Sequence, residues 1–198
     1  MTSRTFLRVA GWSAIFSAVA LVLMVATAIL GPTLRLGNTF SVVVVLLMAL
    51  LIVVALALHL ILRSVAPAMS LAATAIGILG MLLTGAVHVL AMASAISPDQ
   101  FNTTGEGIGP AGIGLWLLLV NYLALRSKAL PRGLPWIGLI AGVGWLLSGV
   151  GALMGGSQNL PFSIGPLGIF LVSPLWAIWL GRRLLAQPDS VPHMARSG

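Results

Sequence analysis

Two histidines fall inside long apolar stretches of this sequence, and they are the first candidates for chemistry. His59 lies near the end of the stretch 40–62, and His88 lies within the stretch 70–95. Burying an ionisable group in lipid is costly, so such a residue marks a site or a hydrogen-bonded contact between helices. His59 lies about one turn from its helix end, where we expect it to reach interfacial water. His88 lies roughly 10 Å inside its helix end and is the stronger candidate.

His88 shares one helix face with small residues. Gly77, Gly80, Thr84 and Ala91 follow spacings of three and four residues that include His88, so these positions lie on the same face. Membrane helices approach closely along such faces, and we therefore expect His88 to point into a bundle. We expect it to be neutral at pH 7, because desolvation disfavours the charged imidazolium. The sequence favours a hydrogen bond to a neighbouring helix and leaves a ligand or proton site as the alternative.

Two carboxylates lie in the segment 96–109, which we interpret as the longest loop. It contains Asp99 and Glu106 among Gln, Asn and Thr residues. The two could form an acid–base pair or a cation gate, with Arg35 of another connection as their salt-bridge partner. Solvated loop residues are the more common case for such side chains. The candidate ligand or proton site therefore comprises His88, Thr84, Asp99, Glu106 and Arg35.

Composition and spacing argue against most catalytic and cofactor chemistry. The sequence has no Cys, which removes thiol nucleophiles, Cys-ligated zinc and iron–sulfur clusters. It has no Ser–His–Asp set, Glu-x-x-His motif or carboxylate cluster at membrane depth, which argues against hydrolases and metal enzymes. His59 and His88 would lie about 20 Å apart along the membrane normal, too far for one haem. We expect no cofactor and no metal, and we favour a non-catalytic protein over a membrane enzyme, which stays a third alternative.

Residues 107–112 match the dinucleotide fingerprint G-x-G-x-x-G letter for letter. That motif works where a strand delivers the turn and a helix N-terminus holds the pyrophosphate. Here no strand precedes it and Pro110 lies within it. We interpret it as a flexible start of the fourth span.

The elements that must position these residues are membrane helices. Hydrophobic residues make up 59% of the 198 residues and charged residues 7%, against roughly 25% charged in soluble domains. The runs are continuously apolar, which favours helices over barrel strands. The net charge of +7 is scattered rather than gathered on one face, so we do not expect nucleic acid as a partner. We predict an all-α polytopic bundle, residues 1–186, with six spans at about 10–30, 40–62, 70–95, 110–125, 134–154 and 161–181.

The Lys and Arg residues predict the orientation of these helices. Nine of the ten fall on one side of the membrane along an alternating path: Arg4, Arg8, Arg63, Arg126, Lys128, Arg132, Arg182, Arg183 and Arg196. The positive-inside rule then places both termini in the cytoplasm. Four aromatic residues at the predicted inner ends agree with this orientation: Trp12, Tyr122, Trp136 and Trp179. We expect a multi-pass protein of the cell membrane with a disordered cytoplasmic tail at 187–198.

The first span has a second interpretation. Arg4 and Arg8, an apolar stretch and then Ala26-Thr27-Ala28 resemble a signal peptide with a small-residue cleavage site. The apolar stretch is nearer 20 residues than the 7–15 that are typical of such peptides. We therefore favour a retained first helix and keep cleavage as the alternative.

Glycines in the fifth span predict close helix packing. Gly138, Gly142 and Gly149 fall on one face, and Gly144, Ser148 and Gly151 fall on another. Two small-residue faces favour close contact with two neighbours, so we expect this helix to be central, and we take Val44 as a lipid-facing position for contrast. In the sixth span, Pro174 predicts a kink after about residue 170.

Two helix starts carry a family resemblance. The segments Arg8-Val9-Ala10-Gly11 and Leu130 to Gly138, which reads LPRGLPWIG, resemble small bacterial multi-pass membrane proteins of the domain-of-unknown-function type. The resemblance implies no activity, substrate or cofactor. We expect a non-catalytic bundle in the lipid bilayer that binds a partner helix, a lipid or a small apolar ligand. The partner helix would come from another membrane protein or a second copy. The alternative is a small transporter or channel with a path near His88 and the segment 96–109.

Overall fold

The computed structural model describes residues 2–34, 38–155 and 159–186. Within these ranges all regular secondary structure is helical, which confirms the all-α prediction. The elements are α1 (Thr2–Leu34), α2 (Thr39–Leu62), α3 (Pro67–Met92), α4 (Pro98–Gln100), the π-helix η1 (Phe101–Ile108), α5 (Gly109–Ser127), α6 (Gly133–Leu153), α7 (Leu160–Leu167), the π-helix η3 (Gly168–Val172) and α8 (Ser173–Leu185). Arg35 and the tail 187–198 lie outside the described residues.

In the described part of the chain, six helical stretches are long and apolar enough to cross a membrane, as the sequence predicts. They are Arg4–Leu30, Thr39–Leu62, Pro67–Met92, Pro98–Ser127, Gly133–Leu153 and Leu160–Leu185. The fourth is longer than expected, because it begins at Pro98 with a capping box formed by Ser97 and Gln100. The expectation that 96–109 is a loop is therefore wrong: the chain is helical from residue 98 onward.

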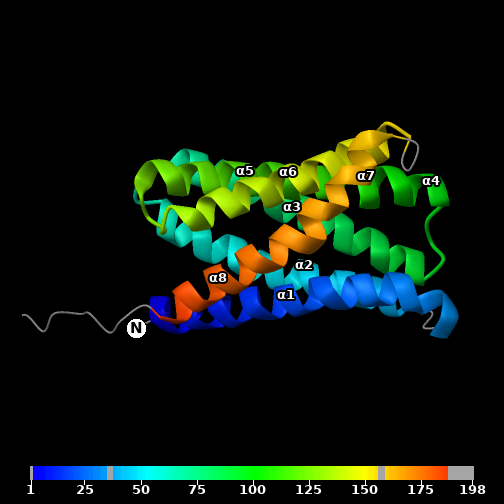
Figure 1. The fold of residues 1–198 in the computed structure, drawn as a ribbon, viewed down its shortest axis with the longest axis horizontal. Helices are drawn as coiled ribbons and strands as arrows, with labels where there is room; N and C mark the ends of the chain where they lie inside the picture. Colours follow the sequence, from blue (N-terminus) through cyan, green and yellow to red (C-terminus); the bar gives the residue numbers. More distant parts are fainter. Residues whose placement is uncertain (1, 35–37, 156–158, 187–198) are drawn as a thin grey trace, which may run out of the picture.

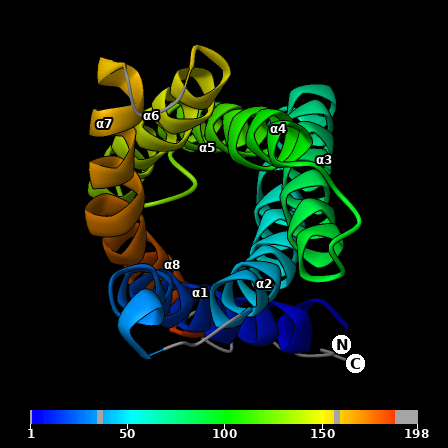
Figure 2. The ribbon, with the colours of Figure 1, turned by 90° about the vertical axis from the view of Figure 1, so that its right-hand side faces the viewer.

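The six long stretches form a closed ring. Each packs against its neighbours in sequence, and α1 packs against α8, so the first and last helices close the circle (Figures 1 and 2). The fifth stretch, α6, packs against α5 on one side and against α7, η3 and α8 on the other. The expectation that this helix is central is therefore wrong. Its two small-residue faces serve two neighbours within the wall of the ring.

Large apolar side chains cover the outside of the ring as well as its interior. Leu46, Leu71 and Leu171 are each more than half exposed, while Leu47 and Leu180 are fully buried. A helix that is apolar all round suits a lipid environment. The four aromatic residues of the predicted belt are also exposed on this surface: Trp12, Tyr122, Trp136 and Trp179. The chain therefore has the surface of a membrane protein.

One glycine face of α6 lies against α5 and η1. A Cβ added at Gly142 would lie 3.0 Å from the backbone N of Leu118 and 3.1 Å from the carbonyl O of Gly114. Gly138 faces the side chain of Asn121, and a Cβ at Gly149 would lie 2.6 Å from the carbonyl O of Gly107. Backbone rather than flexible side chain limits the space at Gly142 and Gly149, so larger residues there would force these helices apart.

The other small-residue face of α6 lies against α7 and η3. A Cβ at Gly144 would lie 2.9 Å from the carbonyl O of Gly165, and Gly151 abuts the backbone of Phe162. Ser148 completes this face beside Gly165. Both small-residue faces of α6 are therefore occupied by neighbours within the same chain.

Two prolines account for the two π-helical segments. In η1 the N–H of Gly109 bonds to the carbonyl of Thr104, and in η3 the N–H of Ser173 bonds to the carbonyl of Gly168. Pro110 and Pro174 follow these residues directly. A proline has no N–H, so the carbonyl four residues earlier loses its α-helical donor. Those two carbonyls belong to Glu106 and Phe170, and the wider turns accommodate the loss.

Candidate functional site

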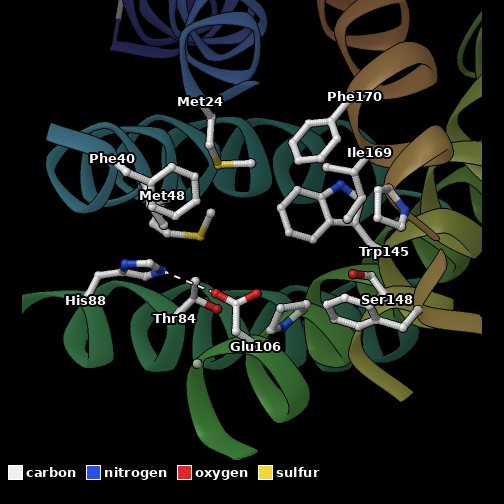
Figure 3. A pocket seen from close by; sticks show the side chains of 15 residues that line it. Met24, Phe40, Met48, Thr84, His88, Glu106, Trp145, Ser148, Ile169 and Phe170 are labelled. Atoms are coloured by element: carbon white, nitrogen blue, oxygen red, sulfur yellow. Dashed lines mark ion pairs between the residues drawn. The ribbon is translucent and has the colours of Figure 1, made fainter. Parts of the chain in front are cut away.

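A cavity of about 170 Å³ lies inside the ring (Figure 3). Its wall draws on α1, α2, α3, η1, α5, α6, α7 and η3. Most of the wall is apolar: Met24, Phe40, Val44, Met48, Pro110, Trp145, Phe162, Pro166, Ile169 and Phe170. Val44 is 3% exposed, so the interpretation of this residue as lipid-facing is wrong.

One corner of the cavity is polar. His88 Nε2 of α3 lies 3.8 Å from Glu106 Oε1 of η1 (Figure 3). The His88 side chain is 2% exposed, while that of Glu106 is 37% exposed. The separation exceeds hydrogen-bond length, so the carboxylate faces the imidazole without being bonded to it. Glu106 is thus the accessible member of the pair.

The His88 ring is fixed from its other sides. Its Nδ1 lies 3.1 Å from the hydroxyl of Ser41 on α2. The edge of Phe101 meets the ring at a centroid distance of 5.1 Å, and Phe40 lies at 5.8 Å. When Nε2 carries the proton, the Ser41 hydroxyl donates to Nδ1 and the Nε2–H points toward Glu106. The imidazole therefore joins α2 and α3 and presents a single nitrogen to the carboxylate.

Two hydroxyl groups on the cavity wall have no hydrogen-bond partner among the described residues. The Thr84 hydroxyl is buried and unpaired on α3, one turn from His88. Ser148 of α6 is also buried, and no described residue bonds to its hydroxyl. A buried polar group without a partner costs about 1–3 kcal/mol. The Thr84 oxygen has almost no exposed surface, so Ser148 is the hydroxyl that a molecule in the cavity could reach.

Both π-helical segments border this cavity. η1 contributes Gly105 and Glu106, and η3 contributes Ile169 and Phe170. π-bulges are frequent at functional sites because they redirect side chains out of the regular helix pattern. Here they direct the one carboxylate and one of the aromatic rings of the wall toward the same space. The prolines that cause these turns thus contribute indirectly to the cavity.

The structure brings together three of the five residues proposed from sequence. His88, Thr84 and Glu106 share the polar corner. Asp99 lies exposed in α4 and is not part of the cavity wall, and Arg35 lies outside the described residues. His88 also lies nearer its helix end than expected. Because α3 ends at Met92, the depth is about 6 Å.

Sequence reasoning missed the contribution of α2. Phe40, Val44 and Met48 recur every four residues and line the cavity, and Ser41 holds His88. The four-residue spacing could have marked this face. The contact between Ser41 and His88 depends on how α2 and α3 are aligned along their length. The continuously apolar sequence of α2 does not specify that alignment, so the contact could not be predicted.

The second histidine makes a similar contact at the opposite end of the same two helices. His59 Nδ1 of α2 lies 3.0 Å from the hydroxyl of Ser70 on α3. Eighteen residues separate Ser41 from His59 on α2, and eighteen separate Ser70 from His88 on α3. The two pairs therefore share one antiparallel register and lie about 27 Å apart, farther than the roughly 20 Å expected. One haem cannot bridge them.

The remaining motifs do not form sites in the described part of the chain. Residues 107–112 run without a break from η1 into α5, so the glycine-rich segment forms no phosphate-binding turn. Its glycines serve packing: a Cβ at Gly112 would lie 3.3 Å from Gly80 Cα. The described residues contain no group of three or more His, Cys, Asp or Glu that could hold a metal ion.

The comparison with known families identifies the chain. Residues 32–186 match the family described as "Domain of unknown function (DUF4386)". The chain belongs to this family. No curated protein and no solved structure matches it. The match confirms the resemblance to proteins of the domain-of-unknown-function type and assigns no activity, so function must be argued from the site itself.

The arrangement suits binding better than acyl transfer. In a Ser–His–acid triad the serine reaches the reacting atom and the acid orients the far nitrogen of histidine. Here the carboxylate lies on the cavity side of His88, and Ser41 is not part of the cavity wall. The accessible group is therefore a carboxylate within an apolar, aromatic space. That combination holds a ligand by its polar end and covers the rest of it.

Proposed function

We propose that this protein is a non-catalytic membrane bundle that binds a small, mostly apolar molecule in the ring cavity. The observation that carries this proposal is the division of the cavity wall into one polar corner and one apolar remainder. Small-molecule sites are commonly built in this way, with a few polar groups that set orientation. An apolar cavity of about 150 Å³ in another protein binds benzene, so about 170 Å³ suits a ligand built on one small ring.

Binding of a partner helix to the small-residue faces of α6 is a weaker proposal. Small-residue faces are what a partner helix would use. Those of α6 are already occupied by α5, η1, α7 and η3. This argues against α6 as the site for another membrane protein or a second copy, and it leaves the cavity as the better-supported binding site.

The proposal is tested by filling the cavity. Ile169 lines the cavity and is 5% exposed, whereas Leu171, two residues away in η3, is 64% exposed. We expect wild type and Leu171→Trp, purified in mild detergent, to carry the same small molecule in native mass spectrometry. We expect Ile169→Trp to lose it. A bound molecule that persists in both tryptophan variants, or none in wild type, would contradict the proposal.

A transporter is the second candidate, and the two π-helical segments favour it. Both π-helical segments adjoin the cavity and each precedes a proline, and such positions are where membrane helices bend. Proteoliposomes loaded with the molecule found by mass spectrometry would separate the two candidates. Release that depends on the protein and is lost in Ile169→Trp indicates transport, whereas retention indicates a binding protein.

A further inference from the structure

We propose that the ligand of this cavity is a lipophilic monocation: a protonated amine or quaternary ammonium group on a small apolar body. This inference rests on the proposed binding function and names its ligand class. The cationic end would lie at Glu106, and the apolar body would lie among the aromatic and methionine side chains (Figure 3).

The Glu106 carboxylate is the first argument. No described residue donates a hydrogen bond to it, and its nearest charged or chargeable neighbour is His88 at 3.8 Å. A carboxylate within an apolar wall is costly unless an opposite charge or hydrogen-bond donors accompany it. The Nε2 atom of that imidazole faces the carboxylate but lies beyond hydrogen-bond distance of it. A bound cation would supply the missing partner.

The charge of the rest of the wall is the second argument. Among the described residues that line the cavity, none is Lys or Arg. An anionic ligand would place its charge beside Glu106 without a strong cation to offset it, whereas a cation meets the carboxylate directly. The cavity wall therefore favours a cationic ligand over an anionic one.

The aromatic side chains are the third argument. Phe40, Trp145, Phe162 and Phe170 contribute rings to the cavity wall. Aromatic faces attract cations, and aromatic residues are the usual recognition elements for quaternary ammonium groups. Met24 and Met48 add polarisable thioethers that adapt to an irregular apolar body. A neutral apolar ligand would use the same rings and leave the carboxylate unused.

The Ser148 hydroxyl distinguishes a protonated amine from a quaternary ammonium group. It lines the cavity, and no described residue forms a hydrogen bond with it, whereas the Thr84 oxygen is packed beside Gly109 and has almost no exposed surface. A protonated amine donates hydrogen bonds and would engage Ser148, whereas a quaternary ammonium group donates none. Comparing the two head groups on one apolar body therefore shows whether this hydroxyl takes part in binding.

The test uses two probes of nearly equal shape. Benzyltrimethylammonium carries one positive charge, and neopentylbenzene is its neutral carbon analogue. Full-length protein in lipid nanodiscs is titrated with each, and binding is followed by displacement of the co-purified molecule and by thermal stabilisation. We expect wild type to bind the cation at least about tenfold more tightly than the neutral probe. Benzylamine serves as the protonated-amine arm.

Variants assign the preference to Glu106. We expect Glu106→Gln, which keeps the shape of the side chain, to lose most of the preference for the cation and to keep its affinity for the neutral probe. Retained binding of the neutral probe also shows that the variant is folded. Asp99→Asn removes an exposed carboxylate from α4, outside the cavity wall, and should bind both probes as wild type does.

Three results would overturn the inference, and they differ in what they say of the proposed function. Equal affinity for the two probes in wild type, or an unchanged preference in Glu106→Gln, contradicts a cationic ligand and leaves the proposed binding function standing. If neither probe binds wild type or displaces the co-purified molecule, the claim that the ligand is a lipophilic monocation is contradicted. If native mass spectrometry also finds no bound molecule, the proposed function fails as well.

Discussion

The two ends of the α2–α3 pair hold the same contact in different surroundings. At one end His59 meets Ser70, and at the other His88 meets Ser41, in one antiparallel register. The His88 end adds Glu106 and an aromatic-lined cavity. The His59 end lies at the opposite end of these helices, away from that cavity. The comparison teaches that a histidine–serine pair joins the helices at both ends, and that the third element, η1, makes one end a candidate site.

The distance between the two ends gives the comparison a physical meaning. Eighteen residues correspond to about five turns and about 27 Å, close to the roughly 30 Å thickness of the hydrocarbon core. The two pairs therefore lie near opposite limits of that core.

The largest effect is expected where η1 and α5 meet α3. A Cβ at Gly80 would lie 2.7 Å from the carbonyl O of Gly109, whereas at Gly85 it would lie 3.7 Å from Met48 Cβ. We expect Gly80→Ala to lower the free energy of unfolding by about 2–3 kcal/mol, because backbone must move. Gly85→Ala should be neutral or stabilising. Thermal denaturation in detergent measures both, and equal stability would contradict the close contact between α3 and α5.

Replacing each histidine separates the two ends more directly. We expect His88→Leu to lower the free energy of unfolding by about 2 kcal/mol, because it removes a fully buried ring that contacts Phe40 and Phe101, and it leaves Ser41 unpaired. His59→Leu also leaves a serine unpaired, Ser70, but His59 is only half-buried, so the loss should be about 1 kcal/mol. His88→Gln, which keeps hydrogen-bonding capacity, should recover much of the loss. Denaturant titration measures the three variants, and a larger loss for His59→Leu would refute the distinction.

Replacing the serines tests what the two ends share. Ser41→Ala and Ser70→Ala each remove one hydrogen bond to a histidine, at 3.1 Å and 3.0 Å respectively. We expect similar losses of about 1 kcal/mol from each. The same titration applies. A loss confined to one variant would show that only one of the two contacts stabilises the helix pair.

The distribution of Lys and Arg predicts which side of the membrane each end faces. Testing this prediction needs no substitution in the helices, so the expected effect on stability is the smallest. The positive-inside rule places the His59 end at the cytoplasm and the His88 end outside. Reporter fusions at Gly198 and after Ala95, which lies in the turn between α3 and α4, should report opposite sides. The same side for both fusions would contradict the orientation.

The sequence predicted the elements better than their register. Continuous apolar runs specify six long helices, and helical spacing placed His88 and Thr84 on one inward face. Residues 98–108 contain glycines, threonines and two charges, so local propensity favours a loop there. Packing makes them helical instead: Gly105 lies against Val87, and Gly107 lies against Leu153. Such contacts between distant segments cannot be read from local spacing.

Closure of the ring sets the order in which this protein can mature. Membrane helices are made one after another, and the cavity takes Met24 from the first and Phe170 from the last. The wall between α8 and α2 is α1, with Gly11 of α1 against Gly181 of α8. The cavity therefore cannot form until synthesis of the sixth stretch is complete, and cleavage near Ala28 would open the ring. The first five helices alone leave the cavity wall incomplete, so the cavity forms only when the sixth helix has been inserted and packed.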